Sequence, residues 1–141
     1  RRTVTTSFGA KFSIPFAVAS LIFHGTADLD NYSDEAVANP VIQALAQRIN
    51  VVENPEYTKA FPGKQIADVR LLFKDGRVYE AREDHMKGEN ENPHSPAEMR
   101  RKFVRLTRDT WGEEHANRVL HGLLALHKVA SFEKFAIEHR F

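Results

Sequence analysis

The chain of 141 residues contains no cysteine, which excludes disulfide bonds, thiolate nucleophiles and metal sites built on cysteine. Neither sign of charge is in excess, because 20 basic side chains stand against 19 acidic ones. A balance this even is not typical of a protein that binds nucleic acid or an anionic membrane. Long apolar runs are also missing, since the longest, from Ile14 to Phe23, is roughly half of a membrane span. We therefore expect a soluble, cytoplasmic protein with no nucleic-acid or membrane partner.

The chain does contain enough apolar material for a packed core, with 42% hydrophobic residues and 10 phenylalanines. A chain of this length buries roughly two thirds of its unfolded surface and corresponds to about one domain. It starts at Arg1 without a methionine. We therefore expect it to be part of a longer protein.

The most hydrophobic segment predicts a core helix. Ser13 is a suitable N-cap, and Pro15 is tolerated in the first turn. Gly25 is a natural residue to end the helix. From Phe16 to Phe23 the helix is apolar on nearly every side, so we expect it to be buried all round.

Shorter elements are expected on both sides of this helix. One of them has the spacing of a single apolar helical stripe, formed by Ile42, Leu45, Ala46 and Ile49. The predicted elements are, in order, a strand or extended arm over residues 3–8 that ends at Gly9, a loop over residues 26–32, a helix capped by Ser33, a helix after Asn39 and Pro40, a strand at Val51 and Val52, and an irregular connection over residues 54–65.

A β-hairpin is the clearest prediction in the middle of the chain. The runs 66–73 and 78–83 flank Asp75-Gly76, a strong hairpin signal. With a two-residue turn, one face of the sheet carries Val69, Leu71, Phe73 and Val78. The opposite face then carries Leu72, Tyr79 and Ala81. Either both faces of the sheet are covered, or a bulge shifts the register.

Helices fill the last third. Ser95, Pro96 and Glu98 form a capping box with proline at the first helical position. The predicted helices are one over residues 97–110 with Met99, Phe103 and Leu106 as its stripe, one over residues 113–128, and a last one capped by Ser131 that carries Phe132, Phe135 and Ile137. The sequence therefore predicts an α+β fold, in which a small antiparallel sheet with a hairpin packs against several helices.

Three segments resemble the C-terminal region of the MmgE/PrpD family, in that family's order. Residues 9–19, Gly-Ala-Lys-Phe-Ser-Ile-Pro-Phe-Ala-Val-Ala, are similar to the family's AKFS-(I/L)-P helix, and Asp75-Gly76 stands where the family has a hairpin turn. Lys87-Gly88, then Asn92-Pro93, the capped helix and Lys102-Phe103 resemble its loop and following helix. The resemblance extends over residues 9–128.

That family includes 2-methylcitrate dehydratase, cis-aconitate decarboxylase and iminodisuccinate epimerase. The resemblance implies that residues 1–141 are the smaller, lid-like domain of a lyase for a small di- or tricarboxylic acid. It also implies that residues 113–141 pack on a helical domain outside this sequence, that the enzyme is a homodimer, and that the reaction needs no metal or other cofactor. The family's catalytic histidines and lysines are expected upstream, so no catalytic residue is assigned here, and we expect the chain to be inactive alone.

Lys11 and Ser13 are the candidate substrate-binding residues. They precede the core helix, where a lysine could meet a substrate carboxylate with help from the positive end of the helix dipole. Alternatively, Lys11 is a surface residue whose stem lies over Phe12. The Lys87-Gly88 turn has the same two interpretations, an anion contact at the edge of the lid or a structural turn.

Two other clusters are interpreted as structural. His115, His121 and His127 lie six residues apart, so their rings cannot converge on one metal ion. His85 and His94 lie in or beside the loop, and no carboxylate motif frames them. The basic residues of the 97–110 helix could meet phosphate, but with Glu98 and Asp109 beside them they are interpreted as a solvated face: Arg100, Arg101, Lys102, Arg105 and Arg108.

The alternative function is a stand-alone α+β module that binds a small acid or another protein. The reading frame upstream of Arg1 distinguishes the two hypotheses. A long helical region with histidine and lysine motifs would support the enzyme, whereas a start codon directly before Arg1 would favour the module.

Overall fold

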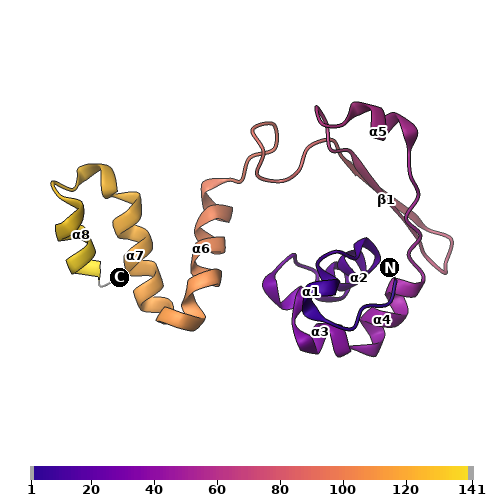
Figure 1. Ribbon diagram of the computed structural model, residues 1–141, viewed down its shortest axis with the longest axis horizontal. Coiled ribbons are helices and arrows are strands. Elements are labelled where there is room, and N and C mark those ends of the chain that lie inside the picture. Colours follow the sequence, from indigo (N-terminus) through magenta and orange to yellow (C-terminus); the bar gives the residue numbers. More distant parts are fainter. Residues whose placement is uncertain (1, 140–141) are drawn as a thin grey trace. The chain divides into compact units, whose positions relative to one another are not determined.

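The computed structural model describes the backbone of residues 2–139 and the side chains of residues 2–136. The chain forms two compact units, Arg1–Lys59 and Ala60–Phe141 (Figure 1). The first is helical, with α1 (Ser7–Ala10), α2 (Ile14–His24), η1 (Leu29–Tyr32), α3 (Asp34–Ala38) and α4 (Pro40–Gln47), and α5 (Pro55–Ala60) lies at the boundary. The second has β1 (Ala67–Leu72), β2 (Val78–Glu83), α6 (Pro96–Trp111), α7 (Glu113–Leu124), η2 (Leu126–Lys128) and α8 (Phe132–His139). The α+β class is confirmed.

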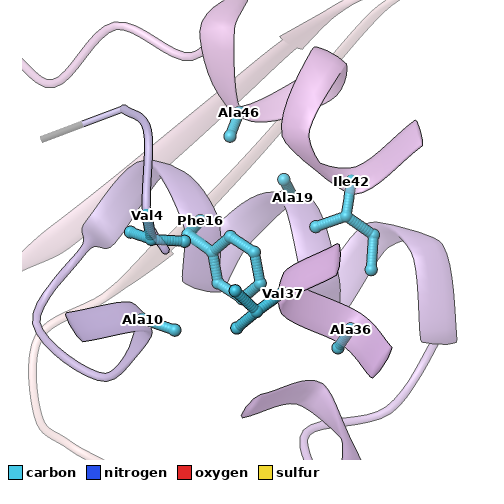
Figure 2. Packing of buried hydrophobic residues seen from close by; sticks show 8 residues of the cluster. All are labelled: Val4, Ala10, Phe16, Ala19, Ala36, Val37, Ile42 and Ala46. Atoms are coloured by element: carbon cyan, nitrogen blue, oxygen red, sulfur yellow. The ribbon is translucent and has the colours of Figure 1, made fainter. Parts of the chain in front are cut away.

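The core of the first unit is built around α2. Phe16 and Ala19, both on α2, are fully buried in the same cluster. Figure 2 shows the Phe16 ring among the other buried side chains of this cluster, which are Val4, Ala10, Ala36, Val37, Ile42 and Ala46. The predicted stripe of α4 is confirmed, since Ile42 and Ala46 are buried and Leu45 and Ile49 pack against the cluster.

The ends of α2 follow from its sequence, but its burial does not. Ser13 Oγ accepts the N–H of Phe16 at 3.2 Å, and Gly25 ends the helix at φ 73°. The expectation of burial all round was wrong, because Leu21, Ile22 and Phe23 are 43%, 44% and 47% exposed. In the first unit α2 packs against α4 and η1, which cover one side of it and leave these apolar side chains open.

The N-terminal residues form an arm and not a strand. Residues 2–5 lack regular secondary structure, and Thr6 caps α1, which contains Gly9. Gln43 Nε2 donates to the Val4 carbonyl at 2.8 Å, and the side chain of Val4 is buried. The arm is therefore held by the α4 side chain of Gln43, which confirms the extended-arm alternative of the prediction; the predicted end at Gly9 was wrong, because Gly9 lies inside α1.

Short capped turns replace two predicted irregular segments. Asp28 and Asn31 form a capping box for η1, with Asn31 Oδ1 accepting the Asp28 N–H at 2.9 Å. Asn54 Oδ1 accepts the Glu56 N–H at 3.0 Å at the start of α5. The segment 54–65 is thus partly helical, and no strand forms at Val51 and Val52. Asn54-Pro55 repeats the Asn39-Pro40 signal that starts α4, so the sequence already contained the evidence for α5.

The hairpin has the shifted register that was predicted as the alternative to a two-residue turn. Leu72 pairs with Val78, and the Phe73 N–H donates to the Arg77 carbonyl at 2.9 Å. The loop therefore has three residues and ends in Gly76 at φ 87°, the conformation that glycine adopts in such loops. Because directly paired residues lie on the same face, one face carries Val69, Leu71, Tyr79 and Ala81, and the other carries the Arg70–Glu80 ion pair at 3.0 Å.

Both faces of this hairpin are open in the second unit. Every residue of β1 and β2 is exposed except Leu71, which is half-buried. The helices that we expected to cover the sheet pack instead on each other, α6 on α7 and α7 on α8. Ala116, Val119, Leu120 and Phe135 are the buried hydrophobic residues that the described part of this unit contains.

The helix boundaries in the last third are close to those predicted. Ser95 caps α6 with Glu98 in the expected capping box, and the predicted 113–128 helix divides into α7 and η2. Ser131 Oγ accepts the Lys134 N–H at 3.5 Å at the start of α8. The side chain of Ile137, predicted for the apolar stripe of this helix, lies outside the described residues. None of the described helices is long and apolar enough to cross a membrane.

Candidate functional site

Lys11 and Ser13 lie in the short link between α1 and α2. Lys11 caps the end of α1 through its backbone N–H, and its side chain is exposed. Ser13 is 2% exposed, and its hydroxyl accepts the Phe16 N–H. The structure therefore gives Ser13 a capping role within this unit, while Lys11 is the one of the two that presents its side chain to solvent.

The first turn of α2 attracts an anion through the helix dipole, but the backbone N–H groups of Phe16 and Ala17 are not free to bind one. Pro15 has no N–H, the Phe16 N–H is held by Ser13 Oγ, and the Ala17 N–H donates to the Ser13 carbonyl at 2.9 Å. A substrate carboxylate at this position would therefore meet Lys11 as a point charge more than a set of helix donors. The ring centroids of Phe8, on α1, and Phe12, on the link, lie 5.0 Å apart, and both side chains are largely exposed.

The polar loop between β2 and α6 is closed on itself. Gly88, at φ 107°, donates its N–H to the Asn92 carbonyl at 2.7 Å. Asn92 Nδ2 in turn donates to the His85 carbonyl at 3.0 Å. A Cβ on residue 88 would lie 3.3 Å from His94 Nε2, so the imidazole packs directly against the glycine. The Lys87-Gly88 pair thus forms a structural turn, and Lys87 Nζ contacts Glu98 at 3.4 Å.

Two carboxylates that flank this loop are held ionised. Hydrogen bonds from Lys64 at 2.6 Å and from Arg82 at 2.8 Å lower the pKa of Asp84 from 3.8 to about 2. The pKa of Glu98 falls from 4.5 to about 2, mainly because its carboxylate accepts the Ser95 N–H at 2.7 Å, with smaller contributions from the Ser95 hydroxyl and Lys87. Groups with such low pKa values are poor proton donors at neutral pH.

This pair makes the stability of the second unit sensitive to acid. A carboxylate whose folded pKa lies below its unfolded value contributes stability above the unfolded pKa and loses it as pH falls toward the folded one. For Asp84 and Glu98 that window runs from about pH 4.5 to 2. We expect Glu98→Gln to flatten the fall of the urea midpoint in this window, measured by circular dichroism. Glu133→Gln, which replaces an exposed carboxylate of α8, is the control, and an unchanged slope in Glu98→Gln would contradict the assignment.

The basic residues of α6 behave as a solvated face. Arg105 and Arg108 each lie 3.4 Å from a carboxylate oxygen of Asp109. Arg100, Arg101 and Lys102 are exposed on the same helix. These charges are partly neutralised within α6 itself, as expected for a surface helix.

The histidines are distributed in a way that only partly follows the prediction. On α7, His115 Nδ1 lies 3.1 Å from an Arg118 guanidinium nitrogen, and His121 is exposed about 1.7 turns further along the helix. His85 does have carboxylates beside it, contrary to expectation. Its ring nitrogen and carboxylate oxygens of Glu89 and Glu91 all lie within 4.8 Å of one another. The signal for this cluster was the short spacing of these three residues in one turn-rich loop.

An open hollow of about 370 Å³ lies between α2 and η1. Its lining is mostly apolar, with Asp28 and Asn31 as polar members. The Asp28 carboxylate in this lining disfavours an acidic ligand, so the hollow is not a second candidate for the binding of a small acid. It was missed from the sequence because residues 26–32 were expected to be an irregular loop.

A comparison with protein families supplies the identity of the domain. The model of the MmgE/PrpD C-terminal domain matches residues 1–126. The chain therefore belongs to the MmgE/PrpD family, in which 2-methylcitrate dehydratase-like lyases are found. A search of curated proteins found no match.

Proposed function

We propose that this chain acts as the lid-like C-terminal domain of an MmgE/PrpD lyase for a small di- or tricarboxylic acid. The proposed reaction is a dehydration of the type that 2-methylcitrate dehydratase catalyses. The observation that carries the proposal is the family match, which runs through both compact units and includes Lys11. The helical N-terminal domain of the same protein is the proposed partner, and residues 113–141 are proposed to pack on it.

The proposed reaction begins with removal of a proton next to a substrate carboxylate and ends with loss of water. The base and acid for these steps are proposed to lie in the helical domain. This domain contributes binding and closure: Lys11 pairs with one substrate carboxylate, and the closed lid excludes water from the reacting atoms. The ionised, paired states of Asp84 and Glu98 support this division, because neither group is suited to proton transfer.

The exposed apolar side of α2 supports a protein partner. Leu21, Ile22 and Phe23 would be covered if another domain packs on this helix, which also suits the alternative of a separate interaction module. We propose that the complete protein is a cytoplasmic homodimer, and we expect most of the dimer contact to come from the helical domain.

The test of the substrate class is an assay of the complete reading frame with a panel of citrate-like acids. Absorbance of an unsaturated product would indicate dehydration, release of carbon dioxide would indicate decarboxylation, and exchange of substrate protons with solvent deuterium would indicate epimerisation. Turnover of one acid supports the proposal. No turnover, together with tight calorimetric binding of one acid to the chain, would favour the small-acid-binding module.

A further inference from the structure

The loop that begins at His85 gathers one imidazole and two carboxylates. We propose that His85, Glu89 and Glu91 bind a divalent transition-metal cation of the Zn²⁺ type. Imidazole nitrogen and carboxylate oxygen are ordinary ligands of Zn²⁺, and solvent can supply the remaining positions. The proposed ion stabilises the loop and takes no part in the lyase reaction, so this inference does not depend on the proposed function.

The distances suit a shared ion better than a direct bond. His85 Nδ1 lies 3.6 Å from Glu89 Oε2, which is too long for a hydrogen bond. Two ligands of one tetrahedral Zn²⁺ at about 2.1 Å each are about 3.4 Å apart. The third ligand comes from Glu91, whose side chain is exposed and can rotate to close the remaining distance within the 4.8 Å cluster.

The distribution of charge around the loop also supports a bound cation. Asp84 is neutralised by Lys64 and Arg82, and Glu98 lies beside Lys87. Within the described part of the chain, no lysine or arginine pairs with Glu89 or Glu91. Two carboxylates held this close repel each other, and a bound cation would remove that repulsion.

The loop also supplies the outer contacts that orient metal ligands. Gln65 Nε2 donates to Glu89 Oε1 at 3.1 Å, which leaves the other carboxylate oxygen directed at His85. Asn92 holds the His85 carbonyl, and Gly88 closes the turn between the two ligands. Such hydrogen bonds fix the orientation of the side chains that bind the metal, and removal of one typically lowers metal affinity by about 10- to 100-fold.

Calorimetric titration of the chain with ZnCl₂ tests the proposal. We expect binding that His85→Ala and Glu89→Gln each weaken at least about tenfold. His127→Ala and Glu114→Gln remove an imidazole and a carboxylate elsewhere and are expected to leave the affinity unchanged. A second measurement uses Mn²⁺, which should broaden backbone NMR signals of residues 85–91 before those of α7.

Each other outcome would overturn the proposal. Equal zinc affinity in His85→Ala and the parent, or Mn²⁺ broadening centred on α7, would place the ion elsewhere. Absence of zinc binding, in a chain that circular dichroism shows to be normally folded, would mean that these three side chains do not form a metal site.

Discussion

Replacing Phe16 with alanine is expected to lower the free energy of unfolding of the first unit by about 3–5 kcal/mol. Phe16 is fully buried and is the largest side chain of the cluster formed by the arm, α1, α2, α3 and α4 (Figure 2). Its neighbours are mostly alanine and valine, which are too small to fill the space of a phenyl ring. The loss therefore combines the transfer energy of the ring with the energy of the cavity that remains.

The matched control for this change is Phe12→Ala. Phe12 is 75% exposed, and its contact with Phe8 is an exposed ring pair, so its removal is expected to change the unfolding free energy by less than about 1 kcal/mol. Urea unfolding followed by far-ultraviolet circular dichroism measures both. If Phe16→Ala and Phe12→Ala destabilise the chain equally, the proposed core is wrong.

The second large effect is expected at Lys11 in the complete enzyme. Removing a charged donor from a substrate carboxylate costs about 1.5–3 kcal/mol, which corresponds to a rise in KM of about 10- to 150-fold for Lys11→Ala. Because the carboxylate is charged in the ground state and in the transition state, kcat is expected to change little. Steady-state kinetics of the complete reading frame separates the two constants.

Two control variants define this result. Lys11→Arg keeps the positive charge and is expected to retain part of the affinity. Lys102→Ala removes another exposed lysine, on α6, and is expected to leave KM unchanged. Since the Lys11 side chain is exposed, a folding defect is not expected from its replacement. An unchanged kcat/KM in Lys11→Ala would remove Lys11 from the proposed substrate site.

Local signals in the sequence were sufficient for the helix ends. Ser13, Ser33, Asn39 and Ser95 cap helices as predicted, because a cap depends on the residues within one turn. The sequence left the register of the hairpin open. The structure decides it, because the three-residue loop that ends in Gly76 places Tyr79 on the same face as Leu71. Both outcomes follow from local backbone chemistry.

Burial was the part that the sequence did not predict. A segment as apolar as Phe16 to Phe23 indicates that a helix will be covered, but not by which part of the protein. In this unit α4 and η1 cover the side of Phe16 and Ala19, while Phe23 stays open. The exposed faces of the hairpin show the same limit. The pairing of two adjacent strands depends on local residues, whereas the burial of their faces depends on distant parts of the protein.

The candidate substrate-binding residues were predicted from their position at the start of the core helix. The structure adds that the Lys11 side chain is exposed beside a helix whose first donors are already used, while Ser13 is buried as the cap of that helix. The cluster of His85, Glu89 and Glu91 was missed, because only the turn at Gly88 brings residues of that spacing together.

The most direct test of the central claim compares the isolated chain with the complete reading frame in the same dehydration assay. If this chain is a lid that binds and closes over chemistry supplied by a helical domain, the complete protein turns over a citrate-like acid and the isolated chain gives no product above the uncatalysed rate. Turnover by the isolated chain at the rate of the complete protein would contradict the account, because the catalytic groups would then have to lie within these 141 residues.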